Sequence, residues 1–242
     1  MLRRSFIKLA AIITASAIGL FTFLGLNREL DRELDRDLEE EYEMGETVEL
    51  HSPQKSSVSI EEAIEGRRSR RQYGDEPLSL KQISQLCWAA QGITEERDNF
   101  RSAPSAGALY PIELFVVSGY SDLEPGVYQY SSSGHRLDRI KQGDVREDLA
   151  RAAVGQQEVK LAAIDMVITG IYRRTAQKYG SRAERYVHLE AGHVAQNIYL
   201  QCESLDLATV SIGAFSDSDV RDLLSVNEEH TPLYIMPIGH KG

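Results

Sequence analysis

The sequence has few of the residues that would build a metal centre, a disulfide framework or a nucleic-acid surface. Its two cysteines, Cys87 and Cys202, both lie in apolar stretches with helical spacing, where a thiol usually behaves as a small buried side chain. The six histidines lack the spacing of metal ligands, so we predict no metal site. A formal net charge of -10 disfavours nucleic-acid binding, which needs clustered positive charge. Function must therefore rest on other residues.

Residues 1–26 have the pattern of an export signal and membrane anchor. Arg3 and Arg4 precede an uncharged stretch from Leu9 to Leu26, which is about the minimum length that spans a bilayer. The order Arg-Arg-x-Phe-Ile-Lys is similar to the twin-arginine export consensus; the alternative is an ordinary signal anchor. The one Ala-x-Ala match, at residues 15–17, lies inside the apolar stretch. We therefore expect an uncleaved anchor, delivered by the twin-arginine export machinery, that holds the protein on the outer side of a membrane.

Residues 27–58 are expected to form a charged spacer and linker. Leucines recur every four residues from Leu26 to Leu38 among alternating acidic and basic residues. This spacing drifts around a helix, so a solvated spacer helix with internal ion pairs is favoured over a coiled coil. The polar run from His51 to Ser57 is typical of a flexible joint. The sequence thus predicts one globular domain over residues 59–242.

The globular part shows an irregular order of helices and strands. Two capping boxes, Ser59 with Glu62 and Ser79 with Gln82, predict helix starts. Apolar runs predict five strands, at residues 112–118, 127–130, 166–171, 208–212 and 233–238. Helical patterns predict a short helix over 144–154 and a long one over 181–204. Because strands do not alternate regularly with helices, we expect an α+β domain with an antiparallel or mixed central sheet.

Two segments have the chemistry of an anion site and of a flat-ligand site. Residues 67–71 read Arg-Arg-Ser-Arg-Arg, in which guanidinium forks and a hydroxyl suit a phosphate. An exposed basic helix end is the alternative. Residues 102–111 form a loop of small side chains between two prolines, Pro104 and Pro111. Small side chains let the backbone approach a flavin ring closely, although such loops are also common turns.

Four motifs together resemble the nitroreductase superfamily, specifically its SagB-type dehydrogenase branch. The first is Arg-Arg-Ser-x-Arg-x-Tyr at residues 67–73, and the second is Pro-Ser-Ala-Gly-Ala-Leu-Tyr-Pro at 104–111. The third begins at Lys178-Tyr179-Gly180 and ends at Gln196-Asn197. The fourth is Ser-Ile-Gly-Ala-Phe at 211–215, where the branch has Pro-Ile-Gly-Gly-Phe. The resemblance covers about residues 59–241.

This resemblance implies an α+β homodimer with one FMN at each of two sites along the subunit interface. Arg67, Arg68 and Ser69 would hold the phosphate and ribityl side of FMN, and Arg71 would lie near the pyrimidine edge of the ring. The residues expected to line the ring are Pro104, Ser105, Ala106, Gly107, Gly213 and Ala214.

The resemblance also points to Lys178 and Tyr179 as catalytic residues. In the branch that oxidises azolines to azoles in peptides, the corresponding pair is implicated in removing a proton while flavin takes a hydride. The alternative is that the two side chains only shape the pocket.

The expected function is that of an FMN-dependent oxidoreductase that takes a hydride from a small-molecule or peptide substrate and passes electrons to oxygen or a quinone. An exported domain would lack NADH and NADPH, which are cytoplasmic. The alternatives are an NAD(P)H-dependent nitro or quinone reductase, and a flavin-binding sensor or scaffold without turnover.

Overall fold

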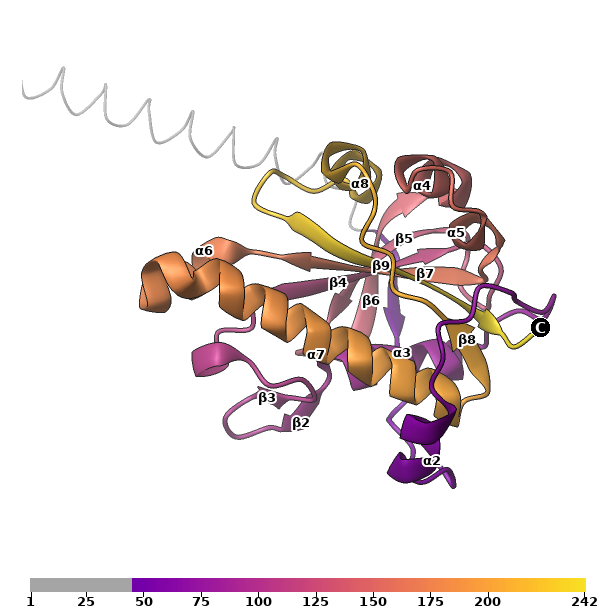
Figure 1. Cartoon of the computed structure of the whole chain (residues 1–242), viewed down its shortest axis with the longest axis horizontal. Helices are drawn as coiled ribbons and strands as arrows, with labels where there is room; N and C mark the ends of the chain where they lie inside the picture. Colours follow the sequence, from indigo (N-terminus) through magenta and orange to yellow (C-terminus); the bar gives the residue numbers. More distant parts are fainter. Residues whose placement is uncertain (1–44) are drawn as a thin grey trace, which may run out of the picture. The chain divides into compact units, whose positions relative to one another are not determined.

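A seven-stranded antiparallel sheet forms the centre of the computed structural model, which describes residues 45–242 (Figure 1). The strand order is β1-β6-β5-β4-β7-β9-β8. The strands are β1 (Thr47–Glu49), β4 (Ile112–Ser118), β5 (Gly126–Ser131), β6 (Arg136–Gln142), β7 (Ile164–Gly170), β8 (Leu207–Thr209) and β9 (Thr231–His240). A separate hairpin consists of β2 (Ile93–Glu95) and β3 (Phe100–Arg101). The predicted α+β class with a central antiparallel sheet is confirmed.

Helices cover both faces of this sheet. They are α2 (Ile60–Gly66), α3 (Leu80–Gln91), α4 (Arg146–Ala152), α5 (Gln157–Leu161), α6 (Tyr172–Tyr179), α7 (Ala183–Ser204) and α8 (Asp217–Leu224), with two 3-10 turns, η1 (Ala106–Ala108) and η2 (Gly180–Arg182). In Figure 1, α7 runs along one side of the sheet with α3, and α4 and α8 lie on the other.

Two apolar cores follow from the alternation of side chains along the strands. On β4, Ile112, Leu114 and Val116 belong to the core beneath α3 and α7. Phe115 and Val117 belong to the second core, beneath α4 and α8. Successive residues of a strand point to opposite faces, so an apolar run without polar interruption marks a strand buried on both sides.

Both capping boxes are present as predicted. The Ser59 side chain accepts a hydrogen bond from the Glu62 amide at the start of α2, and Ser79 does the same for Gln82 at the start of α3. Each box satisfies amides that would otherwise lack a partner at a helix start. The long helix was predicted to start at 181 and begins at Ala183 instead, because a 3-10 turn occupies residues 180–182.

The amino-terminal boundary of the compact unit differs from the sequence pattern. The unit runs from Gly45 to Gly242, and β1 pairs with β6 through Thr47, Val48 and Glu49. Residues 45–58, expected to be spacer and linker, therefore lie within it. The expected anchor and most of the charged spacer, residues 1–44, lie outside the described residues. Within residues 45–242 the helices are too short or too polar to cross a membrane.

Candidate functional site

The basic segment lies just beyond α2, alongside the strand β8. The helix α2 stops at Gly66, and Arg67 has left the helical conformation, with φ -53° and ψ 122°. The arginines therefore do not continue the helix, as the interpretation of a basic helix end would require. The amide of Arg70 then donates to the Thr209 carbonyl at 2.9 Å. Because this segment runs beside β8 instead of continuing the helix, its side chains lie near the loop that carries Gly213 and Ala214.

The four arginines of the segment differ in their partners. Arg70 lies 3.8 Å from the Glu203 carboxylate, and Arg71 lies 3.3 Å from that of Glu158. Arg67 stacks over the Tyr199 ring, 5.3 Å from its centroid. Arg68 donates only to backbone carbonyls, those of Glu65 and Arg67. Within residues 45–242, then, Arg67 and Arg68 have no carboxylate at ion-pair distance, and these two match the pair expected at the phosphate.

Tyr199, on α7, connects this basic segment to the loop after β8. Its hydroxyl lies 3.1 Å from the Ser69 hydroxyl and accepts a hydrogen bond from the Ser211 amide at 2.7 Å. The Ser211 amide thus binds a side chain instead of a neighbouring strand. The sequence pattern predicted this strand to reach Ile212, but β8 ends at Thr209. Ile212 still pairs with Ile235 of β9 as an isolated bridge in the same register. Tyr199 was not among the predicted site residues.

The loop after β8 presents an open backbone surface. Gly213 and Ala214 are exposed, and a Cβ added to Gly213 would meet only the Tyr234 ring, at 4.0 Å. The Gln156 side chain donates to the Ala214 carbonyl at 3.2 Å. A flat ligand could therefore approach this backbone without a steric barrier from the described residues.

The small-residue loop, residues 102–111, is held in a constrained conformation beside α7, which contacts it through Asn197. Gly107, Ala108 and Tyr110 have φ angles of 66°, 54° and 45°. Left-handed backbone is costly for residues other than glycine, so the surrounding contacts must impose it. The Ser105 hydroxyl accepts from the Tyr110 amide at 2.9 Å, and the Asn197 side chain donates to the Ser102 carbonyl at 3.3 Å.

Lys178 and Tyr179 lie directly against this loop. Both residues lie in the last turn of α6. A Cβ added to Gly107 would come within 2.9 Å of both the Lys178 Nζ and the Tyr179 hydroxyl. The Tyr179 ring packs edge to face against Tyr186 of α7, with centroids 4.9 Å apart. The structure therefore brings Gly107, Lys178 and Tyr179 together, as the proposed chemistry requires.

A buried carboxyl, Glu190 of α7, lies close to the same loop and was missed from the sequence. It is 2 % exposed, and neither oxygen accepts a hydrogen bond from a described residue. Burial raises the pKa of Glu190 to about 7, while the nearby Ser105 side chain and the Arg101 charge lower it. The signal was available, since Glu190 interrupts the apolar face made by Val187, Ala191 and Val194.

The predicted site residues thus form two groups in one chain. The first contains Arg67, Arg68, Ser69, Arg71, Gly213 and Ala214, and the second contains Ser105, Ala106, Gly107, Lys178 and Tyr179, with the exposed Pro104 at its edge. Their contacts on α7, Tyr199 and Tyr186, lie roughly 20 Å apart along the helix axis at 1.5 Å per residue.

Residues 64–240 match the Nitroreductase family. The chain belongs to this family, and it is an oxidoreductase. It is 44 % identical over 199 residues to MJ1384 of Methanocaldococcus jannaschii, whose name assigns it to the nitroreductases; the match covers 82 % of this chain and 99 % of that one.

Within the nitroreductase family, the chain falls in the SagB-type branch. It is 25 % identical over 170 residues to the Escherichia coli microcin B17-processing protein McbC. The match covers 67 % of this chain and 62 % of McbC. This agrees with the four motifs of the branch.

Solved structures of nitroreductase-family proteins share the fold. A Ralstonia eutropha protein named for the family superposes with a TM-score of 0.71 at 28 % identity, covering 81 % of this chain and 90 % of that one. The NADPH:FMN oxidoreductase of Vibrio harveyi superposes with a TM-score of 0.54 at 24 % identity. The superposition covers 75 % of this chain and 68 % of that one.

Proposed function

We propose that this nitroreductase-family oxidoreductase is an FMN-dependent, SagB-type dehydrogenase that removes a hydride and a proton from a small-molecule or peptide substrate. The observation that carries the proposal is the contact of the Gly107 backbone with the Lys178 and Tyr179 side chains. A potential base and a phenol lie against the loop that is expected to line the flavin. General acid–base chemistry needs such groups within hydrogen-bond reach of the reacting proton.

The residues present fit FMN on two counts. Arg67 and Arg68 carry positive charges that no described carboxylate neutralises at ion-pair distance, which suits a phosphate. Gly213 and Ala214 offer an exposed backbone, and the space where a Gly213 Cβ would lie is open, which suits an aromatic ring. When bound, the flavin would accept the hydride. Arg71 would lie at the pyrimidine edge, where a positive group stabilises the reduced ring.

The separation of the two residue groups favours a homodimer. A two-fold axis that sets the α7 helices of two copies against each other could bring the first group of one copy to the second group of the other, because such an interface is self-complementary. The exposed face of α7 carries Leu189, with 55 % of its surface accessible, next to Gly192, which has open space around it. We propose two equivalent FMN sites at this interface.

The proposed electron acceptor is oxygen or a membrane quinone. This choice rests on the expected twin-arginine signal and anchor in residues 1–26, which would place the domain on the outer side of a membrane, away from NADH and NADPH. A reporter fusion after Lys55 tests it: activity of a reporter that works only outside the cytoplasm supports export, and activity of a cytoplasm-only reporter contradicts it.

The experiment that tests the main proposal is a visible spectrum of the purified full chain after incubation with FMN. We expect a bound-flavin band that bleaches under anaerobic conditions when a substrate donates electrons, and that returns with oxygen. Lys178→Ala and Tyr179→Phe should keep the band and slow its bleaching. Unchanged bleaching in both variants would assign these side chains to pocket shape, and absence of a flavin band would overturn the whole proposal.

An NAD(P)H-dependent nitro or quinone reductase is the second candidate. It is favoured by the 44 % identity to a protein with a nitroreductase name. The same spectrum distinguishes the two, because rapid bleaching by NADH or NADPH supports the reductase. A flavin band that no donor bleaches would indicate a binding protein without turnover.

A further inference from the structure

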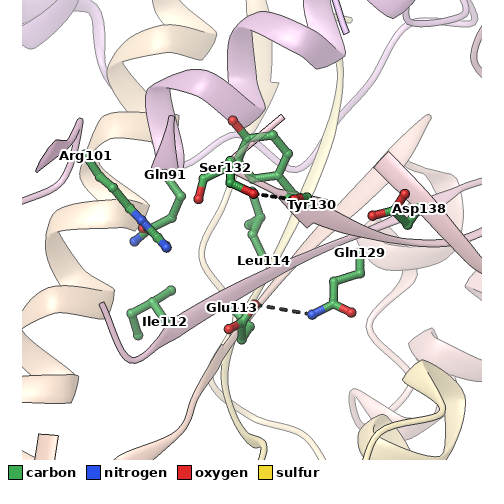
Figure 2. A pocket seen from close by; sticks show the side chains of 11 residues that line it. Gln91, Arg101, Ile112, Glu113, Leu114, Gln129, Tyr130, Ser132 and Asp138 are labelled. Carbon is green, nitrogen blue, oxygen red and sulfur yellow. Dashed lines mark hydrogen bonds between the residues drawn. The ribbon is translucent and has the colours of Figure 1, made fainter. Parts of the chain in front are cut away.

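A polar pocket of about 330 Å³ lies between β4 and the β5–β6 hairpin, with Arg101 among its lining residues (Figure 2). It exists because the strands diverge there. β4 pairs with β5 only from Phe115 onward, whereas β5 stays paired with β6 through Ser131. The first residues of β4, Ile112, Glu113 and Leu114, therefore form one wall, and Gln129 and Tyr130 form the opposite one. Its volume is at the lower end for small-molecule sites, roughly 300–1,000 Å³.

One end of the pocket carries unused hydrogen-bond donors. Gln91 is 1 % exposed, and its Oε1 accepts from an Arg101 guanidinium nitrogen at 3.0 Å. Because arginine only donates, this bond fixes the amide orientation, and the Gln91 Nε2 group is left without a partner among the described residues. A buried donor without a partner costs free energy that a ligand could recover. In Figure 2, Gln91 and Arg101 lie side by side at one end of the pocket.

The other walls carry two carboxylates, each paired with an arginine. Glu113 binds Arg174 at 2.5 Å and accepts from the Gln129 amide at 3.3 Å, and Asp138 binds Arg136 at 3.1 Å. A carboxylate has about four lone-pair sites, so both groups keep capacity for a further donor. The acceptor sites left on Glu113 and Asp138 suit a ligand that also carries an ammonium group, which a phosphate lacks.

We propose that this pocket binds a small amino-acid-like zwitterion. Its carboxylate is held by the Gln91 amide and the Arg101 guanidinium, and its ammonium group faces Glu113. The arrangement provides donors at one end and acceptors beside them, as a zwitterion requires. No part of it uses the residues proposed for FMN, so the site stands or falls independently of the flavin chemistry.

The test is calorimetry on the purified full chain with a panel of L-amino acids, followed by derivatives of the tightest binder and by inorganic phosphate. We expect saturable binding of an amino acid, weaker binding of its N-acetyl derivative, and none of its carboxamide or of phosphate. Binding of the carboxamide or phosphate as tight as that of the acid would overturn the proposal. So would a panel without any binder.

Two isosteric variants and one control complete the test. Gln91→Glu keeps the acceptor for Arg101 and replaces the free donor by an acceptor, so affinity should fall by about 10-fold or more, as for a lost charge-assisted hydrogen bond. Glu113→Gln should remove the preference for the free amine over its N-acetyl form. Gln82→Glu, the same change on α3 within the capping box, should leave affinity unchanged. Equal affinity in all three variants would contradict the assignment even if an amino acid binds.

Discussion

Gly107 brings the backbone closer to two side chains than another residue type allows. Its φ is 66°, and an added Cβ would meet Lys178 Nζ and the Tyr179 hydroxyl at 2.9 Å. Both atoms end flexible side chains, so Gly107→Ala should displace them without preventing folding. We expect a loss of about 1 kcal/mol in the free energy of unfolding, from the left-handed backbone, and a larger loss of turnover.

The control for this substitution is Gly143→Ala. Gly143 has a φ of 93° and open space where a Cβ would lie. Denaturant unfolding should show a similar loss for both variants, and turnover should fall only for Gly107→Ala. Equal turnover in the two would mean that the position of Lys178 and Tyr179 does not limit the reaction.

Glu190 should make stability depend on pH. A glutamate in water has a pKa of about 4.5, and burial raises the pKa of Glu190 to about 7. Between pH 4.5 and pH 7, Glu190 is ionised in the unfolded chain but keeps its proton in the folded chain. The free energy of unfolding is therefore highest below pH 4.5, with respect to this group, and falls as pH rises through about 7. Glu190→Gln removes this loss. As pH rises from 4.5 to 8, the free energy of unfolding of the variant should increase relative to that of the wild type by up to about 3 kcal/mol.

The measurement is denaturant unfolding at a series of pH values for wild type, Glu190→Gln and Glu184→Gln. Glu184 is exposed on the same helix, so its variant should follow the wild-type curve. Asp165 is also buried, and burial raises its pKa, but it contributes equally to all three proteins. Parallel curves for all three would show that folding does not shift the pKa of Glu190.

At the scale of elements, α7 aligns the segment after α2 with the loop after β8 through Tyr199. Tyr199→Phe removes the acceptor for the Ser211 amide and the contact with the Ser69 hydroxyl. We expect a loss of about 1 kcal/mol in stability and a several-fold weaker affinity for FMN, measured by flavin fluorescence titration.

The matched control is Tyr128→Phe. The buried Tyr128 hydroxyl donates to the Glu124 carbonyl at 2.7 Å, away from the predicted cofactor residues. Loss of the Tyr128 hydroxyl should lower the free energy of unfolding about as much as Tyr199→Phe does, and should leave the affinity for FMN unchanged. If both variants bind FMN as tightly as wild type, Tyr199 supports the fold but not the cofactor site.

The elements predicted well from sequence are those whose signal is local. Ser59 and Ser79 begin their helices because each capping box is complete within four residues. The strand 112–118 was predicted with its observed bounds, since its apolar run is preceded by Pro111 and followed by Ser118 and Gly119. The long helix was recognised from its apolar periodicity.

The missed elements depend on contacts distant in sequence. β6, Arg136–Gln142, is largely polar and is a strand because β1 and β5 pair with it on either side. α6 contains one buried residue, Thr175, so its sequence shows no apolar stripe, and no helix was predicted over Lys178 and Tyr179. For the predicted site, the sequence names candidate residues, but only the fold shows that Gly107 lies against Lys178.

At the scale of the whole molecule, the two groups of site residues are each incomplete. One offers arginines and an open backbone, and the other offers the constrained loop with Lys178 and Tyr179. Roughly 20 Å of α7 separates their contacts in the same chain. A symmetric pair of chains would form two complete sites, so dimerisation and cofactor binding should be lost together.

Leu189→Glu tests this coupling. Leu189 is exposed on the face of α7 proposed as the interface, and a charge there would be buried without a partner on both copies. We expect the wild type to be a dimer by light scattering, and the variant to be a monomer with at least about 10-fold weaker FMN affinity. Tyr120→Glu replaces an equally exposed apolar residue, 50 % accessible, on the loop after β4 and should alter neither property. A monomeric Leu189→Glu variant that binds FMN with wild-type affinity would mean that one chain suffices for the cofactor, because the two properties would then be separable.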